Sequence, residues 1–268
     1  MRSRPRSAVI AVSLAAVAAA CGSSASGSQS GSTTLTVLAA ASLNRVFPKI
    51  AAEFSKTHPD VSVRFSFAGT DALLAQIDQG SPGDVFAGAS SRYGRQLFQE
   101  RLVERPRAFA TNRLVVIVPP ANPAGIASPR DLAKPGIKLV VGAEAVPVGT
   151  YTRKALANLD DLYGPSYFQS VLANVVSNED NVEGVLTKVR LGEADAGFAY
   201  VTDAKAVGGS IRSIQLPAEA QAVATYPIAV IGSSGHRGAA RRFETFVLSP
   251  AGQRLLSNAG FGPPPAAP

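Results

Sequence analysis

The chain has 268 residues, of which 46% are hydrophobic, and a formal net charge of +7. This length is sufficient for two modest domains or one large domain. Three of the basic residues are arginines within residues 1–20, and the rest of the chain carries 23 basic against 19 acidic side chains, a charge of +4. This excess is mild and scattered, so the sequence does not indicate a nucleic-acid-binding protein.

Residues 1–20 have the composition of a secretory signal, because three arginines precede an apolar run too short to span a bilayer as a permanent helix. Cys21, the only cysteine, follows directly and begins a Gly- and Ser-rich stretch over 21–32. This arrangement resembles the bacterial lipoprotein signal. The resemblance implies a signal peptide over 1–20 and acylation of Cys21, with 21–32 as a tether at the extracytoplasmic face of the cell membrane. With one cysteine no internal disulfide can form, so stability must come from the core.

The first predicted strand, residues 34–38, runs through three alanines into Ser42 and then into an amphipathic helix over 43–55. We predict that Ser42 is the N-cap of this helix. A helix N-terminus presents unpaired backbone N–H groups and the positive end of the helix dipole, so an anion can bind beside the small alanines. An N-cap serine without a ligand is the alternative. Pro48 lies inside the predicted helix and predicts a kink.

Strands and helices alternate along the rest of the chain, which predicts an α/β protein with mainly parallel, largely buried strands. The further strands are expected at 61–67, 84–87, 114–118, 137–141, 174–177, 195–199, 211–216 and 226–231. The further helices are expected at 71–79, 91–100, 151–160, 181–191, 239–248 and 250–258.

Two long apolar strands, 113–118 and 226–231, suggest how the chain divides. If both cross between lobes, they are the connectors of a discontinuous domain pair. The predicted division is 33–112 with 232–262 for lobe one, 119–225 for lobe two, and 263–268 for a disordered tail. A single nine-stranded sheet is the alternative.

Four more turns place small or hydroxyl residues before a helix or at the end of a strand. They contain Thr70, the segment 146–151, the segment 178–182, and Tyr200. Because these turns come from both halves of the chain, they predict one shared anion site in a cleft.

Six short strings carry a more specific signal, and they occur in order within 33–262. They are Ala-Ala-Ala-Ser-Leu (39–43), Phe-Ala-Gly-Thr (67–70), Gly-Asp-Val-Phe (83–86), Val-Pro-Val-Gly-Thr-Tyr (146–151), Glu-Asp-Asn-Val (179–182) and Ala-Tyr-Val-Thr-Asp-Ala (199–204). Together they resemble the molybdate-binding proteins of bacterial molybdate ABC transporters. The resemblance implies a two-lobed periplasmic-binding-protein fold of type II, in which each lobe is a sheet flanked by helices and the ligand cleft lies between the lobes.

The resemblance also implies the ligand and the residues that hold it. Molybdate or tungstate would be bound by donors at Ser42 and Thr70, by the N–H groups of Val148 and Val182, and by the phenol of Tyr200. The protein would capture this oxyanion outside the cytoplasm and deliver it to the transmembrane permease of an ABC transporter. We expect a monomer with no cofactor and no side-chain site for a metal cation.

These residue types suit a fully ionised oxyanion, which only accepts hydrogen bonds. A pocket of donors alone disfavours protonated phosphate, and neutral donors avoid the desolvation of an additional cation. No Arg or Lys occurs in the five ligand turns. Asp71 follows Thr70, and we expect its carboxylate to face helix N–H groups or solvent, because it would otherwise repel a dianion.

Enzyme functions find little support, because the nucleophile-elbow, phosphate-loop and zinc-protease motifs are absent from the sequence. We expect His58 and His236 at the surface, and Asp84 and Asp203 in structural roles such as helix capping. The sequence therefore predicts a binding protein and not an enzyme. The alternatives are the same scaffold binding sulfate, phosphate or a small organic acid, or an extracellular hydrolase of phosphate esters.

Overall fold

The computed structural model describes residues 32–266. The predicted signal peptide and the predicted lipid attachment at Cys21 lie outside these residues. Among the helices that the structure describes, none combines the length and the apolar character needed to cross a membrane.

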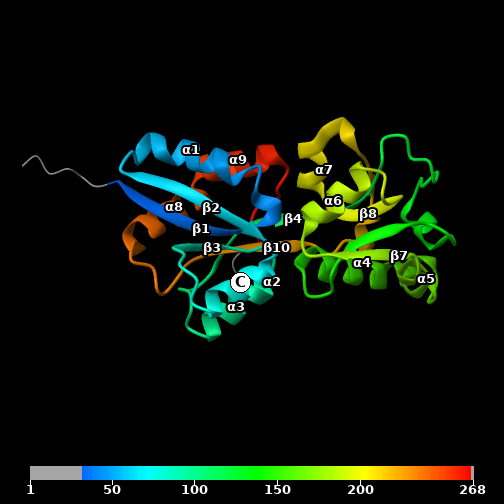
Figure 1. The fold of residues 1–268 in the computed structure, drawn as a ribbon, viewed down its shortest axis with the longest axis horizontal. Coiled ribbons are helices and arrows are strands. Elements are labelled where there is room, and N and C mark those ends of the chain that lie inside the picture. The colour runs from blue at the N-terminus through cyan, green and yellow to red at the C-terminus, as the bar shows by residue number, and fades with distance from the viewer. Residues whose placement is uncertain (1–31, 267–268) are drawn as a thin grey trace, which may run out of the picture. The chain divides into compact units, whose positions relative to one another are not determined.

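The first lobe is built on a five-stranded sheet of order β2-β1-β3-β10-β4 (Figure 1). Its strands are β1 (Thr33–Ala40), β2 (Val61–Ala68), β3 (Val85–Ala87), β4 (Arg107–Asn112) and β10 (Ala224–Val230). Its helices are α1 (Phe47–Thr57), α2 (Thr70–Asp78), α3 (Ser91–Gln99), α8 (Arg237–Leu248) and α9 (Pro250–Ala259). Strand β1 is parallel to β2 and β3, whereas β10 is antiparallel to β3 and β4.

The second lobe has its own five-stranded sheet, of order β7-β6-β8-β5-β9. Its strands are β5 (Leu114–Val118), β6 (Leu139–Gly142), β7 (Val175–Glu179), β8 (Ala196–Tyr200) and β9 (Arg212–Gln215). Its helices are α4 (Pro147–Tyr163), α5 (Tyr167–Ala173), α6 (Val182–Arg190) and α7 (Val201–Val207). Short 3-10 turns are η1 (Ala41–Leu43), η2 (Pro129–Ala133), η3 (Gly208–Ser210) and η4 (Ala218–Ala220). The two sheets confirm the predicted two-lobed α/β fold and exclude the single nine-stranded sheet.

The two strands that we expected to connect the lobes lie inside the sheets instead. Strand β5 pairs with β8 and β9 in the second sheet, and β10 pairs with β3 and β4 in the first. The chain crosses between Asn112 and Leu114, and again over residues 216–223. Gln221 joins these crossings, because its side-chain amide accepts a hydrogen bond from Leu114 N at 3.2 Å and donates one to Leu114 O at 2.9 Å. Both strands are apolar because they are internal to buried sheets.

The first helix also departs from the prediction. It begins at Phe47, so Pro48 stands in its first turn, where proline is tolerated and the reason for expecting a kink does not apply. The structure also contains one strand and two α-helices that the sequence analysis did not predict: β4, α5 and α7. The start of the predicted disordered tail is held in place, because Thr111 Oγ1 donates a hydrogen bond to the carbonyl oxygen of Pro263 at 3.0 Å.

Aromatic side chains hold the helices on the first sheet. The ring of Phe47 lies 5.7 Å from that of Phe109 and 6.2 Å from that of Phe243, and Phe54 meets Phe243 edge to face at 5.4 Å. These buried contacts join α1 and α8 to strand β4. They fix the position of α1 and of the turn that precedes it, and that turn contains Ser42.

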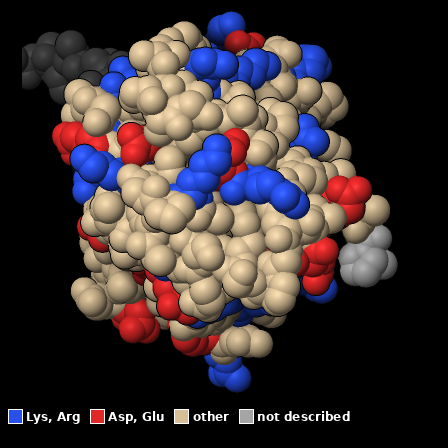
Figure 2. Space-filling model, turned by 90° about the vertical axis from the view of Figure 1, so that its right-hand side faces the viewer, with Lys and Arg blue, Asp and Glu red and all other residues tan. Residues whose placement is uncertain are grey.

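The end of the second lobe carries charged side chains of both signs. On the face drawn in Figure 2, Lys and Arg side chains are interspersed with Asp and Glu side chains. This face therefore carries no broad field of one sign of the kind that nucleic-acid-binding proteins present.

Candidate functional site

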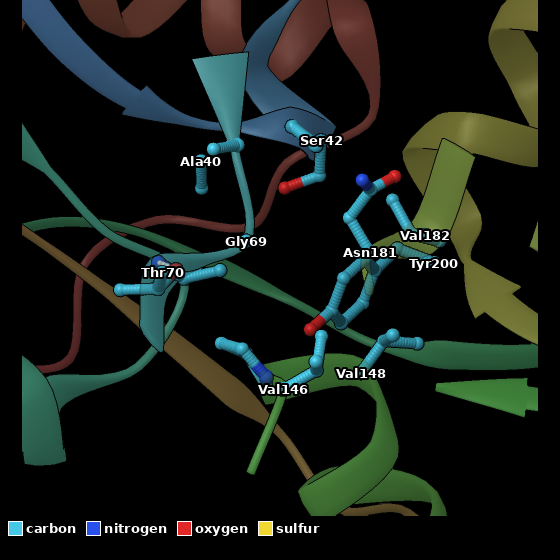
Figure 3. A pocket seen from close by; sticks show the side chains of 13 residues that line it. Ala40, Ser42, Gly69, Thr70, Val146, Val148, Asn181, Val182 and Tyr200 are labelled. Carbon is cyan, nitrogen blue, oxygen red and sulfur yellow. Dashed lines mark hydrogen bonds between the residues drawn. The ribbon is translucent and has the colours of Figure 1, made fainter. Parts of the chain in front are cut away.

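A small cavity lies between the lobes, where turns at the ends of strands meet the first residues of helices (Figure 3). Its volume is about 20 Å³. On the same scale, a cavity that holds one water molecule measures about 10–15 Å³, so this site suits a small ion. The residues that line it are Ala40, Ala41, Ser42, Ala68, Gly69, Thr70, Ala89, Val146, Pro147, Val148, Asn181, Val182 and Tyr200.

The topology explains why these turns meet. In the first sheet β1, β2 and β3 run parallel, so the turns after Ala40 and Ala68 lie at one edge. In the second sheet β6 is parallel to β7 and β8, so the turns after Gly142, Glu179 and Tyr200 also share an edge. All five residues that were predicted to bind the anion lie together in the structure, because each lines the same cavity.

Ser42 occupies a different local structure from the one predicted. It lies within η1 and not at the N-cap of α1, and it is 6% exposed. Its Oγ lies 2.9 Å from the Oη of Tyr226, a buried residue of β10. Asn112 Nδ2, which can only donate, lies 3.4 Å from the same Oη. Tyr226 therefore accepts from Asn112, and where it donates to Ser42 the hydroxyl hydrogen of Ser42 is left for a ligand.

Thr70 is the first residue of α2, and Gly69 is the N-cap. The backbone N–H of Ala89 donates to Thr70 Oγ1 at 3.1 Å, so the hydroxyl hydrogen of Thr70 is also free to donate. The neighbouring Asp71 does not line the cavity, and its Oδ1 is buried without a hydrogen-bond partner among the described residues. The expected hydrogen bonds from helix N–H groups to this oxygen are therefore not observed.

The second lobe offers two backbone donors. Val148 and Val182 lie in the first turns of α4 and α6, where N–H groups have no partner within the helix. Neither N–H makes a hydrogen bond with another described residue. Asn181, the N-cap of α6, accepts with its Oδ1 from the N–H groups of Glu183 and Gly184 and leaves that of Val182 unused. The sequence reading did not assign Asn181 to the site, although an asparagine directly before a predicted helix is a capping signal.

Tyr200 ends β8 and is 1% exposed. Its hydroxyl has no hydrogen-bond partner among the described residues, and in Figure 3 it points into the cavity, as does the hydroxyl of Ser42. Burial raises the pKa of Tyr200 well above its usual value, and the nearby Tyr226 and Tyr151 add to this effect. The phenol therefore remains a donor at neutral pH. A buried hydroxyl without a partner is costly, and a bound acceptor would satisfy it.

The two aspartates considered in the sequence have structural roles. Asp84 accepts hydrogen bonds from the Thr36 N–H at 2.7 Å and from the Ser234 hydroxyl at 2.6 Å. Asp203 caps α7 and accepts from the Tyr200 N–H at 3.1 Å. Over residues 32–266, no group of three or more His, Cys, Asp or Glu side chains is arranged to hold a metal ion.

Comparisons with known proteins agree with this architecture. The family model described as bacterial extracellular solute-binding protein matches residues 35–262. The molybdate-binding protein ModA of Mycobacterium bovis is 37% identical over 235 residues, which cover 87% of this chain and 86% of that protein.

Two solved structures share the fold at lower sequence identity. The periplasmic molybdate-binding protein of Azotobacter vinelandii has a TM-score of 0.74 at 19% identity, over 86% of this chain and 99% of that one. The sulfate-binding protein SubI of Mycobacterium tuberculosis has a TM-score of 0.78 at 18% identity, over 87% of this chain and 88% of that one. The predicted resemblance is thus confirmed, and this chain belongs to the family of bacterial extracellular solute-binding proteins.

Proposed function

We propose that this protein binds molybdate in the cavity between its lobes and presents it to the permease of an ABC importer. The observation that supports this most strongly is the donor set of the cavity. Among residues 32–266, the Tyr200 hydroxyl, the N–H groups of Val148 and Val182 and the Thr70 hydroxyl have no acceptor, and Ser42 can turn its hydroxyl hydrogen to a ligand when Tyr226 donates to it. No charged side chain lines the cavity. A small, fully ionised oxyanion only accepts hydrogen bonds and satisfies such a set.

The choice of molybdate over sulfate depends on sequence and on size. The fold alone does not decide it, because molybdate-binding and sulfate-binding proteins both share it. The 37% identical relative is named for molybdate binding. Sulfate is the smaller tetrahedron, so in a rigid closed cavity some donors would be too far away to bond it. Tungstate has the geometry of molybdate, and we propose that it binds as well.

Thermal unfolding with a panel of oxyanions tests this proposal. A ligand that binds only the folded state, at about one hundred times its dissociation constant, stabilises that state by roughly 2.7 kcal/mol. We expect molybdate and tungstate to raise the melting temperature, and sulfate and phosphate at the same concentration to raise it much less. Equal shifts with sulfate and molybdate, or no shift with any oxyanion, would contradict the proposal.

We further propose that the protein acts without turnover. The competing function, hydrolysis of phosphate esters, predicts release of nitrophenol from nitrophenyl phosphate in the presence of a divalent metal. We expect no release above that of the buffer, even at high protein concentration. Sustained release that follows the protein through purification would favour the hydrolase.

The anchor at Cys21 is a separate proposal, supported by its position after residues 1–20 and before a Gly- and Ser-rich stretch. Cys21→Ser should move the protein from the membrane fraction to the soluble fraction and leave molybdate binding unchanged, because the tether separates the anchor from the fold. Recovery of the unaltered protein in the soluble fraction, with an unmodified cysteine, would refute anchoring.

A further inference from the structure

We propose that the ion pair between Arg45 and Glu183 is a clasp that keeps the lobes closed and determines how long the ligand stays bound. This inference rests on the proposed function, because it concerns release from the same cavity. The two residues are positioning residues, since neither lines the cavity itself.

The pair joins the two lobes directly. Arg45 precedes α1 in the first lobe, and Glu183 lies in the first turn of α6 in the second. Arg45 Nη1 donates to Glu183 Oε1 at 2.5 Å, and Nη2 donates to Oε2 at 3.1 Å. Such two-point pairing of a guanidinium with a carboxylate is strong and directional. The side chains are 35% and 28% exposed, so solvent screens the pair only in part.

The position of the pair connects it to the ligand. Arg45 follows Ser42 by three residues, and Glu183 follows Val182 by one. Each partner thus belongs to a turn that supplies a donor to the cavity. The bidentate pair requires these two turns to be close together, which is also what a ligand bound by both Ser42 and Val182 requires. An interaction made only in the closed state raises the population of that state and slows reopening.

Neighbouring groups keep Arg45 available for this contact. Arg45 Nη1 also donates to Asn44 Oδ1 at 3.2 Å, which orients the guanidinium. Asp203 is the other carboxyl group close to Arg45, but it is buried, and burial raises its pKa to about 8. Asp203 is therefore mostly protonated at neutral pH and competes weakly for the guanidinium. Arg45 also compensates the negative charge of Glu183, which would otherwise lie uncompensated near a bound dianion.

The chain offers a matched control for an experiment. Arg241 of α8 and Glu104 form a similar two-point pair, with Nη2 to Oε1 at 2.6 Å and Nε to Oε2 at 3.2 Å. Both of these residues belong to the first lobe, so this pair should not respond to closure. It is also more exposed, which makes it the weaker of the two pairs.

The test measures molybdate dissociation by stopped flow, through tyrosine fluorescence because the chain has no tryptophan. The variants are Arg45→Gln, Glu183→Gln, the double substitution, and the control Arg241→Gln. We expect each of the first two to raise the dissociation rate constant about three- to tenfold, with little change in association. The double variant should release the ligand no faster than Arg45→Gln, because either substitution breaks the same pair and only Arg45→Gln leaves the charge of Glu183 uncompensated near the dianion. The control should match the unaltered protein.

Three results would overturn the clasp: unchanged dissociation in Arg45→Gln and Glu183→Gln, additive effects in the double variant, or the same increase in Arg241→Gln. If the unaltered protein binds neither molybdate nor tungstate, the proposed function fails. The clasp is then tested by comparing the radii of gyration of the unaltered protein and the variants, measured without ligand. A larger radius for Arg45→Gln than for both the unaltered protein and Arg241→Gln would support the clasp. Equal radii would refute it.

Discussion

The carbonyl oxygen of Asp180, in the second lobe, lies 2.5 Å from the position that a Cβ atom on Gly69 of the first lobe would occupy. Gly69 has φ −58°, which any residue can adopt, so the backbone conformation does not require glycine here. The requirement comes from the close approach of the lobes, and Asp71 Oδ1 of the first lobe would also lie 2.7 Å from that Cβ. Gly69 lines the cavity next to Thr70, and Asp180 directly precedes Asn181, which also lines it.

Gly69→Ala should therefore hinder closure, whereas in the open protein only the Asp71 side chain, which can rotate, has to move away from the new Cβ. A Cβ 2.5 Å from a carbonyl oxygen is far inside van der Waals contact, so the turns must separate by several tenths of an ångström. We expect a loss of molybdate affinity of about tenfold or more, and a melting temperature without ligand close to that of the unaltered protein. Titration calorimetry measures the first quantity and calorimetric melting the second. Gly235→Ala, where a Cβ would meet open space, is the control.

Tyr200→Phe tests whether the hydroxyl of Tyr200 binds the ligand or whether the side chain only supports the cavity wall. The substitution removes the hydroxyl that has no partner among the described residues and keeps the ring in the cavity wall. A hydrogen bond to a charged group contributes about 1.5–3 kcal/mol, so the dissociation constant should rise between about tenfold and a hundredfold. Without ligand the variant should melt at the same temperature or a higher one. Unchanged affinity in calorimetry would show that the phenol is not a ligand donor.

Tyr226→Phe tests whether the buried phenol orients Ser42. Tyr226 Oη lies 2.9 Å from Ser42 Oγ, and donation by the phenol would direct the serine hydrogen toward the ligand. Ser42→Ala should weaken molybdate binding by a factor similar to that for Tyr200→Phe, whereas Tyr226→Phe should weaken it by a few-fold only. Thr70→Ser, which keeps its hydroxyl, serves as a control and should bind almost normally. A Tyr226→Phe protein that loses as much affinity as Ser42→Ala would indicate that the phenol does more than orient the serine.

Asp203→Asn tests the effect of burial on a carboxyl group. Burial raises the pKa of Asp203 to about 8, from an ordinary value of 3.8. Between these values the folded state holds a proton that the unfolded state has released, so Asp203 lowers the free energy of unfolding as pH rises from about 4 to 8. The asparagine side chain would keep an acceptor for the Tyr200 N–H and would not titrate.

The quantity to measure is the free energy of unfolding of the Asp203→Asn variant minus that of the unaltered protein, by urea titration at several pH values. Taking the difference cancels the opposite contribution of Glu179, whose pKa is lowered by its hydrogen bonds to Lys188 and Ser177. The difference should grow from pH 4 to pH 8 and then level off. A difference that is constant over this range would mean that Asp203 is ionised in the folded protein throughout.

Local sequence patterns were sufficient to locate the turns that line the cavity. A strand that runs into small residues and then into an amphipathic pattern specifies a strand, a turn and a helix start. These signals placed Ser42, Thr70, Tyr200 and the segments 146–151 and 178–182 in turns, and the resemblance to molybdate-binding proteins selected Val148 and Val182 within two of these segments. All five residues line one cavity, although Ser42 is not the N-cap that was predicted. The α/β class followed from the same alternation, because hydrophobic periodicity is set by neighbouring residues.

The tertiary structure decided which groups those residues contact. Ser42 was expected to cap a helix, yet its hydroxyl bonds Tyr226, 184 residues further along the chain. Arg45 pairs with Glu183 across 138 residues. Strands β5 and β10 looked like connectors and are sheet members, because an apolar run shows that a strand is buried but not which strands lie beside it. Contacts of this kind depend on strand order and on lobe closure, and local propensities contain information about neither.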